Sequence, residues 1–211
     1  MIKVSIADDH RIVREGLRRI LAEAPDIKVM DEAGDSREII EKIRSNRPDV
    51  VLMDISMPDM DGLDATKQIH ALFPELPILI LTVHPARQYA SRILRAGARG
   101  YLNKQAAPEE LIDAVRKVCA GRRYLSPEVS EELALQLIGE GADFSPVESL
   151  SDRELQILCL IAKGRKATEI AEGLCLSIKT VNTYRARVLY KLHLRNNADL
   201  TRFAIKNNLI K

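Results

Sequence analysis

Three carboxylates, a threonine and a lysine share one placement in this sequence, because each stands at or just past the end of a short apolar run. They are Asp8 and Asp9, Asp54, Thr82 and Lys104. Carboxylates that lie close together repel one another and need a cation at neutral pH. Ligands that are all oxygen favour a hard ion that keeps some water, which means Mg²⁺. A lysine beside them can hold a further anionic group as a point charge, and a threonine hydroxyl can hydrogen-bond the same group.

A carboxylate in this setting can also act as a nucleophile, since an aspartyl phosphate is a known covalent intermediate. A metal ion there would bridge the nucleophile and the phosphoryl oxygens and offset their charge. The sequence therefore predicts a pocket for Mg²⁺ and a phosphoryl group, with Asp54 as the nucleophile. Each residue alone has a plainer interpretation. On that interpretation, the Asp8-Asp9 pair caps a helix, Thr82 is an ordinary strand end, and Lys104 is a surface lysine.

These side chains meet only if the apolar runs are strands of one parallel sheet. Residues 50–53 form an unbroken apolar run before Asp54, which is typical of a strand buried on both faces. Five strands alternating with five helices predict a doubly wound, five-stranded parallel sheet with right-handed crossovers. Its strands converge at their carboxyl ends on one crevice. We expect strands at 2–7, 27–33, 50–53, 77–82 and 100–102. We expect helices at 11–24, 63–72, 88–96 and 108–119, and a further helix that begins after Ser36 as its cap.

The charge is divided unevenly along the 211 residues. From Leu150 to Lys211 there are 12 Lys/Arg against 5 Asp/Glu, and before Leu150 there are 20 against 25. An acidic first part joined to a basic last part indicates two domains with different partners. The basic part is a candidate for contact with a phosphate backbone, although a solvated basic face is an equal interpretation. We expect a first domain at 1–121, a linker with one helix at 122–149 and a second domain at 150–211.

Neither composition nor sequence pattern indicates a membrane protein. No apolar run approaches the roughly 18 residues of a spanning helix, and the first residues lack the form of a secretory signal. Three scattered cysteines favour small buried side chains in a reducing compartment over a disulfide or zinc framework. A cytoplasmic location is expected.

The second domain is predicted to be an all-α, four-helix unit with a helix-turn-helix. Ser151 to Glu154 has the form of a capping box, and a tight turn at 175–177 leads into a longer helix, 178–192, that contains no Asp or Glu. Such a helix suits a polyanionic groove. An apolar strip on the last helix, formed by Leu200, Phe203 and Ala204, serves either dimerisation or core packing. We expect base contacts from Asn182, Thr183 and Arg187 and phosphate contacts from Lys179, Thr180 and Arg185, against the alternative of a solvated helix face.

Residues 1–120 resemble the CheY-like, flavodoxin-like receiver domain of two-component response regulators. The matching elements are Asp8-Asp9, Asp54 in the pattern D-x-x-M-P-x-x-D-G, Thr82, and Gly100-Tyr101-Leu102-x-Lys104. The resemblance implies that Asp54 accepts phosphate from a phosphohistidine of a sensor histidine kinase. It implies that Asp9, Asp54 and the main-chain carbonyl of Ser56 bind Mg²⁺, with Asp8 acting through water. Lys104 would pair with the phosphoryl group, and Thr82 and Tyr101 would form the switch.

Residues 150–211 resemble the output domain of the NarL/FixJ (LuxR-type) regulators. Within that family, the amino-acid sequence of residues 179–185 is similar to the GacA/UvrY type. The matching residues are Leu150-Ser-x-Arg-Glu154, Ala162-x-Gly164, Glu169-Ile-Ala171, Leu174, Ser177, Lys179-Thr-Val181 and Lys191-Leu192. The whole chain then resembles a phosphorylation-controlled, DNA-binding transcription regulator. It would not be an enzyme beyond its own phosphotransfer and dephosphorylation.

The same resemblance implies the partners. One recognition helix covers only a few base pairs, so we expect a homodimer on palindromic promoter sites, with RNA polymerase as a further candidate partner. The opposite charges suggest that the unphosphorylated receiver occludes the output domain. His84, two residues past Thr82, is a candidate for tuning the phosphate lifetime or a plain surface histidine.

Two rival functions would also use parts of this pattern. A phosphatase of the haloacid dehalogenase type needs a second Asp two residues after the nucleophile, where this chain has Ser56. An adaptor that binds protein partners through its helical domain would differ from a regulator by showing no salt-dependent DNA binding.

Overall fold

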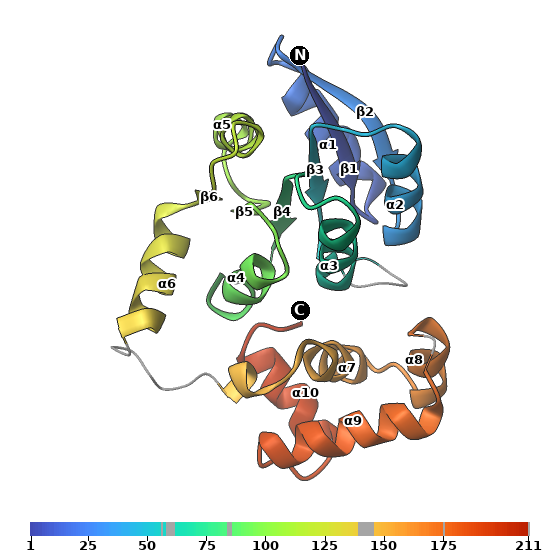
Figure 1. Cartoon of the computed structure of the whole chain (residues 1–211). Coiled ribbons are helices and arrows are strands. Elements are labelled where there is room, and N and C mark those ends of the chain that lie inside the picture. Colours follow the sequence, from blue (N-terminus) through green and yellow to red (C-terminus); the bar gives the residue numbers. More distant parts are fainter. Residues whose placement is uncertain (56, 58–61, 84–85, 139–145, 175, 211) are drawn as a thin grey trace. The chain divides into compact units, whose positions relative to one another are not determined.

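The computed structural model describes residues 1–55, 57, 62–83, 86–138, 146–174 and 176–210 (Figure 1). The chain divides into two compact units, Met1–Ala134 and Leu135–Lys211. The first unit is built around a β-sheet and the second is helical. None of the described helices combines the length and the apolar character that a membrane span requires.

The sheet of the first unit is wholly parallel and has the strand order β2-β1-β3-β4-β5-β6. The order reverses between β1 and β3, which is the crevice expected of a doubly wound fold. The strands are β1 (Ile2–Ala7), β2 (Ile27–Ala33), β3 (Val50–Met53), β4 (Ile78–Thr82), β5 (Gly100–Asn103) and β6 (Tyr124–Leu125).

The sixth strand corrects the predicted number of five. Strand β6 is only two residues long, too short for a sequence pattern, and it exists because it pairs with the edge of β5, Gly100 opposite Tyr124. A Cβ atom at Gly100 would lie 2.7 Å from the Leu79 side chain and 3.0 Å from the main-chain oxygen of Tyr124. Glycine at this position therefore lets the two strands approach.

Helices cover both faces of the sheet in two groups, with α1 contacting α5 on one side and α2, α3 and α4 in succession on the other (Figure 1). Helix α2 begins one residue earlier than the predicted cap implies, because Asp35, not Ser36, is the cap. The Asp35 carboxylate accepts hydrogen bonds from the main-chain N–H groups of Arg37 and Glu38. The helices are α1 (Arg11–Ala22), α2 (Ser36–Ser45), α3 (Gly62–Leu72), α4 (Ala86–Arg95), α5 (Pro108–Cys119) and α6 (Pro127–Ile138).

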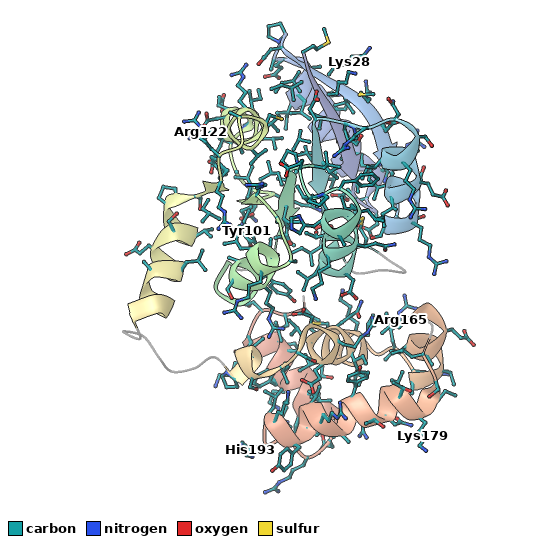
Figure 2. All side chains as sticks on the ribbon, in the orientation of Figure 1. Lys28, Tyr101, Arg122, Arg165, Lys179 and His193 are labelled. Atoms are coloured by element: carbon teal, nitrogen blue, oxygen red, sulfur yellow. The ribbon has the colours of Figure 1, made fainter. Side chains whose placement is uncertain are left out.

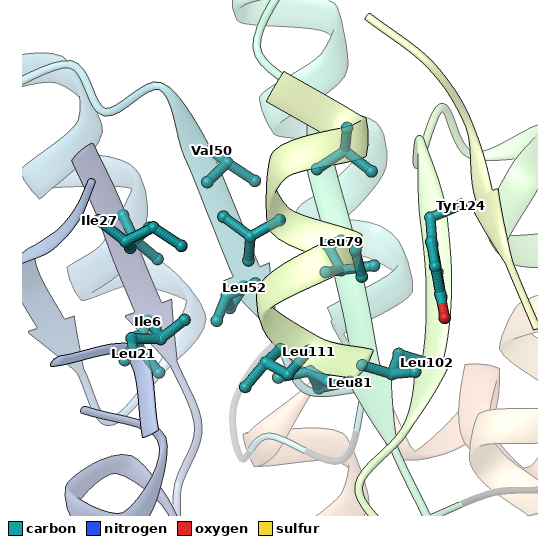
Figure 3. Close-up of a cluster of buried hydrophobic side chains, with 14 of the residues drawn as sticks. Ile6, Leu21, Ile27, Val50, Leu52, Leu79, Leu81, Leu102, Leu111 and Tyr124 are labelled. Atoms are coloured by element: carbon teal, nitrogen blue, oxygen red, sulfur yellow. The ribbon is translucent and has the colours of Figure 1, made fainter. Parts of the chain in front are cut away.

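One core cluster lies between the sheet and the helices α1 and α5 (Figure 3). Alternate residues of the strands point into it, including Ile6, Leu52 and Leu81, and α5 contributes Leu111 from the other side. All four residues of β3 are fully buried, as predicted for a strand covered on both faces. In helix α1, the pattern of apolar residues at helical spacing would place Ile12 on the same face as the buried Leu21, but Ile12 is 87% exposed. Ile12 sits in the first turn, past the strand ends, where the helix has not yet reached the sheet.

The second unit begins with the end of α6, and its described residues from 146 onward form one 3₁₀ turn, η1 (Pro146–Ser149), followed by four helices. The Ser151–Glu154 capping box is present at the start of the first of them. Leu200 and Ala204 are fully buried and their helix packs on α7, so for these two residues the core interpretation of the apolar strip is correct. The helices are α7 (Asp152–Ala162), α8 (Ala167–Gly173), α9 (Ile178–Lys191) and α10 (Asn197–Lys206).

Candidate functional site

The predicted pocket residues meet at the carboxyl edge of the sheet. Ala7 pairs with Met53 in the ladder between β1 and β3, so that Asp8 and Asp54 leave the sheet side by side. The main-chain N–H of Asp54 donates to the carbonyl of Ala7 at 2.8 Å. Two strands further along, the main-chain N–H of Lys104 donates to the carbonyl of Thr82 at 3.0 Å. Backbone hydrogen bonds therefore fix where the side chains of Asp54 and Lys104 leave the main chain.

One lysine bridges two buried carboxylates in this pocket. Lys104 Nζ lies 2.6 Å from Asp8 Oδ2 and 2.8 Å from Asp54 Oδ2. Asp8 is 1% exposed and Asp54 is 4% exposed, while the side chain of Lys104 is 13% exposed. The second oxygen of each aspartate accepts a main-chain N–H, from His10 for Asp8 and from Ile55 for Asp54, each at 2.8 Å.

The charges of this trio are not balanced, and the pKa directions follow from that. Burial raises the pKa of the Asp54 carboxyl and the charge of Asp8 adds to the rise, so that the opposing effect of Lys104 is outweighed. Burial lowers the pKa of the Lys104 ammonium, but its two carboxylate partners outweigh burial and the pKa is raised. One ammonium shared by two carboxylates leaves the pocket with excess negative charge, which favours a bound cation.

The donor atoms of the pocket fit a metal ion. One oxygen each from Asp8, Asp9 and Asp54 and one ring nitrogen of His10 all lie within 4.8 Å of one another. A donor set dominated by carboxylate oxygen suits a hard divalent ion such as Mg²⁺. Of the predicted ligands, Ser56 lies outside the described residues, as does His84. His10 was not predicted as a donor, although it directly follows the two aspartates.

Two further residues shape the pocket and were also missed. A guanidinium N–H of Arg14 on α1 donates to the main-chain carbonyl of Asp8, and Arg14 Nε lies 3.7 Å from Glu32 Oε2 on β2. At Gly62, the start of α3 runs so close to the end of β3 that a Cβ atom would overlap the main-chain oxygen of Asp54. The glycine in the D-x-x-M-P-x-x-D-G pattern was the sequence signal for this close approach.

The two predicted switch residues are both buried in the first unit. Thr82 ends β4 and pairs with Asn103, the neighbour of Lys104. Tyr101, labelled in Figure 2, lies on β5 opposite Ile80 and is 1% exposed. Burial raises the pKa of the Tyr101 hydroxyl. Both residues belong to the same strand pair, which ends at the pocket.

In the second unit, α8 and α9 form the predicted helix-turn-helix. Ser177 caps α9, since its hydroxyl accepts the main-chain N–H of Thr180 at 3.0 Å. Val181 and Val188 are the buried face of α9. In Figure 2, Lys179 projects from α9 on the side away from α7.

The six predicted DNA contacts lie on or beside the solvent face of α9. Lys179, Asn182, Thr183 and Arg187 are exposed, and Thr180 and Arg185 are half-buried. Arg185 Nε donates to Asn197 Oδ1 on α10 at 2.6 Å. The Thr183 hydroxyl donates to the carbonyl of Lys179 at 2.9 Å. Asn182 and Arg187 thus project their polar groups outward while Arg185 is tied to the neighbouring helix.

An ion pair between a buried glutamate and a partly exposed lysine, which sequence inspection missed, joins the start of α7 to the end of α9. Lys191 Nζ on α9 lies 2.7 Å from Glu154 Oε2 on α7 and 3.0 Å from the main-chain oxygen of Ser149. Burial of Glu154, which is 3% exposed, works against its charge. The bonds from Lys191 and from the main-chain N–H of Ser151 outweigh burial, so that the pKa of Glu154 is lowered. The pair fixes the end of α9 against the start of α7.

Comparison with known proteins agrees with this geometry. Residues 4–116 match the family model of the response regulator receiver domain, and residues 148–204 match that of the bacterial regulatory proteins of the luxR family. The chain is 44% identical over 209 residues to the response regulator UvrY of Escherichia coli (strain K12), covering 99% of this chain and 96% of that protein. It is 40% identical over 210 residues to the response regulator GacA of Pseudomonas aeruginosa, covering 100% and 98% of the two chains.

A solved structure is similar over nearly the whole chain. It is RcsB from Salmonella enterica serovar Typhimurium, bound to promoter rprA in the presence of the phosphomimetic BeF3⁻, with a TM-score of 0.75 and 31% identity over 96% of this chain and 97% of that one. Fold, pocket and matches together define a two-component response regulator. Within that class the chain belongs to the NarL/FixJ family, which joins a receiver to a LuxR-type helix-turn-helix. It is a phosphorylation-controlled, DNA-binding regulator of transcription.

Proposed function

We propose that Asp54 accepts a phosphoryl group from a phosphohistidine of a sensor histidine kinase, and that the modified receiver promotes DNA binding by α9. The observation that carries this proposal is the position of Lys104 Nζ, in contact with both Asp8 and Asp54. An ammonium that already contacts the nucleophile is placed to hold the anionic group that the nucleophile receives.

The transfer itself requires little chemistry from the protein beyond position and charge. An Asp54 carboxylate oxygen forms the new bond to phosphorus as the bond to the kinase imidazole breaks, and the imidazole leaves with the electron pair. Lys104 then pairs with the phosphoryl oxygens, while the carboxylates of Asp8 and Asp9 remain available to a cation. A bound Mg²⁺, held by Asp9, Asp54 and the Ser56 carbonyl and through water by Asp8, would offset the negative charge of the reacting groups. Hydrolysis is a separate reaction that ends the phosphorylated state: water attacks the phosphorus, the Asp54 carboxylate leaves, and inorganic phosphate is released.

The switch proposed for the receiver joins Thr82 to Tyr101. The Thr82 hydroxyl moves toward the phosphoryl group, and the space it leaves accepts the Tyr101 ring. The burial of Tyr101 on the strand next to Thr82 supports this role, because a movement of either side chain there must change the packing around the other. The face formed by α4, β5 and α5 changes with it.

The DNA contacts are proposed from the exposed face of α9. Asn182, Thr183 and Arg187 would meet base edges, and Lys179, Thr180 and Arg185 the phosphates. The contact of Arg185 with Asn197 supports a backbone role, since it draws that side chain toward the flank of the helix. A homodimer on two half-sites is required for useful affinity. Contact with RNA polymerase is compatible with the exposed surface.

The test is selection of genomic DNA fragments by the full-length protein, with and without a small phosphodonor and Mg²⁺. Asp54→Ala and Asn182→Ala are assayed beside the wild type. We expect enrichment of a palindromic site that rises with the phosphodonor, no such rise in Asp54→Ala, and a loss of about 1–3 kcal/mol of discrimination at one base pair in Asn182→Ala. Equal enrichment by wild type and Asp54→Ala in every condition would contradict control through Asp54.

A further inference from the structure

The structure places an imidazole at the rim of the acidic pocket. His10 Nδ1 lies 2.6 Å from Asp9 Oδ1 and 3.6 Å from Asp8 Oδ1. Its ring nitrogen falls within the same 4.8 Å set of donor atoms as one oxygen each of Asp8, Asp9 and Asp54. A purely oxygen-lined magnesium pocket has no need of this nitrogen.

The backbone holds His10 in this place. Its main-chain N–H donates to Asp8 Oδ1 at 2.8 Å, and its carbonyl accepts the N–H groups of Val13 and Arg14 in the first turn of α1. His10 occupies the cap position of α1, yet its side chain makes no capping hydrogen bond. The side chain is 66% exposed, so burial in a core does not account for its position either.

We propose that His10 is a nitrogen ligand of the metal site and that it shifts the site's preference from Mg²⁺ toward Mn²⁺ and other first-row transition ions. This inference rests on the proposed function, since it concerns the metal that serves the same pocket. Imidazole suits transition ions better than it suits Mg²⁺, and the affinity of a mixed nitrogen and oxygen site rises along the first-row series. Three carboxylates alone would bind both ions in oxygen sites of similar strength.

A plainer role for His10 is a hydrogen bond that orients the Asp9 carboxylate. Such a role would support every divalent ion in the same way and would leave no nitrogen on the metal. The two roles therefore differ in two measurable properties, the ratio of Mn²⁺ to Mg²⁺ affinity and the presence of a nitrogen nucleus beside the ion.

The test uses the unphosphorylated full-length protein with Mn²⁺ and Mg²⁺. Pulsed EPR of bound Mn²⁺ detects the magnetic coupling of a directly ligated ¹⁴N, and calorimetric titration gives both dissociation constants. In His10→Ala we expect the ¹⁴N coupling to vanish, Mn²⁺ binding to weaken by about tenfold and Mg²⁺ binding to change by less than about twofold. Because the His10 side chain makes no capping bond, the variant keeps the helix start, which thermal unfolding of both proteins checks.

Two other histidines serve as controls. His70 lies on α3 beside Gly97, and His70→Ala should keep both the coupling and the affinities. His84 follows Thr82 by two positions in the sequence, and loss of the coupling in His84→Ala instead of His10→Ala would overturn the assignment. Mn²⁺ bound without ¹⁴N coupling would overturn the role of His10 and leave the proposed function standing. Failure of the wild type to bind either ion would overturn both.

Discussion

Replacing Lys104 by Met removes an ammonium that contacts both buried aspartates. The side chains are of similar length, so the change deletes charge and little volume. Breaking a buried ion pair by removing one partner costs about 3–5 kcal/mol, because the remaining charge is left buried without compensation. We expect the receiver of Lys104→Met to lose about 3 kcal/mol of unfolding free energy at pH 7.5, at the lower end of that range because Lys104 is partly exposed.

Proton uptake sets an upper limit to this loss and gives it a pH dependence. The folded variant can protonate Asp54, and relative to its ordinary pKa of 3.8 this costs 1.36 kcal/mol per pH unit, or about 5 kcal/mol at pH 7.5 and about 1.6 kcal/mol at pH 5. A carboxyl whose pKa is raised by folding binds more protons in the folded chain than in the unfolded chain. Stability therefore falls as the pH rises above 3.8 toward the folded pKa. The difference between variant and wild type should shrink from pH 7.5 to pH 5.

Divalent metal should restore part of the loss. With a dissociation constant of about 1 mM, 10 mM Mg²⁺ stabilises the wild type by about 1.4 kcal/mol. The variant should gain more, because its carboxylates no longer share an ammonium and attract the ion more strongly. Removal of the metal by chelation should reverse the gain.

Hydrogen exchange followed by mass spectrometry measures this in the full chain. Peptides that cover β1 and β3 should exchange about a hundredfold faster in the variant at pH 7.5, where 3 kcal/mol is about two decades of rate. Peptides of α7 to α10 give an internal reference. Lys117→Met is the matched control, since Lys117 makes an exposed pair with Asp113, and exposed pairs contribute about 0–1 kcal/mol. Equal protection in the two variants, or a loss that grows toward pH 5, would refute the argument.

The remaining predictions concern the backbone and the helical unit, and each is read by unfolding or by hydrogen exchange of the affected segment. Gly62→Ala should destabilise the receiver by about 3 kcal/mol, since its Cβ would meet main-chain atoms that cannot move aside, including Ile55 Cα at 2.8 Å. The control is Gly16→Ala, where a Cβ would have no atom within 4 Å and the receiver should gain roughly 0.5–1 kcal/mol of stability. Similar effects of the two substitutions would contradict the close approach at Gly62. Glu154→Gln should cost the helical unit about 1–2 kcal/mol at pH 7, because it weakens the bond from Lys191, whose side chain is 37% exposed and stays solvated. Because the folded pKa of Glu154 is lowered from 4.5, the wild type should lose this advantage as the pH falls through that folded pKa, and a difference that persists in strong acid would argue against the ion pair. Ser177→Ala should cost about 1 kcal/mol through loss of the α9 cap, and unchanged protection of α9 would show that the cap contributes nothing.

The sheet and the clustering of the pocket could be predicted because both depend on local pattern. An apolar run such as residues 50–53 followed by Asp54 carries its own length, its own burial and the position of its polar end. Once five such runs lie parallel, topology brings their ends together without further information from the sequence. The chemical roles of those residues stay predictions.

Features that arise from pairing between distant segments could not be predicted in this way. Strand β6 has two residues and depends on the edge of β5. Glu154 and Lys191 are 37 positions apart, and only the packed helices bring them to 2.7 Å. The cap of α2 was assigned one residue late, because Asp35 and Ser36 are both capping residues. The extended backbone at Asp35, with φ near −148°, is what distinguishes them.

Strand pairing also explains how a change at the pocket can reach the rest of the receiver. Thr82 ends β4 and Lys104 directly follows β5, and the two are joined by a main-chain hydrogen bond. Tyr101 lies on β5, three residues before Lys104. Strand β5 pairs on its far side with β6, Tyr101 opposite Leu125, and β6 leads within two residues into α6. A displacement of Tyr101 would therefore move β5, and β5 is hydrogen-bonded to β6, which begins the segment that leads to the second unit. The strand absent from the sequence prediction thus lies directly between the predicted switch residue and the chain that leads to the DNA-binding helices.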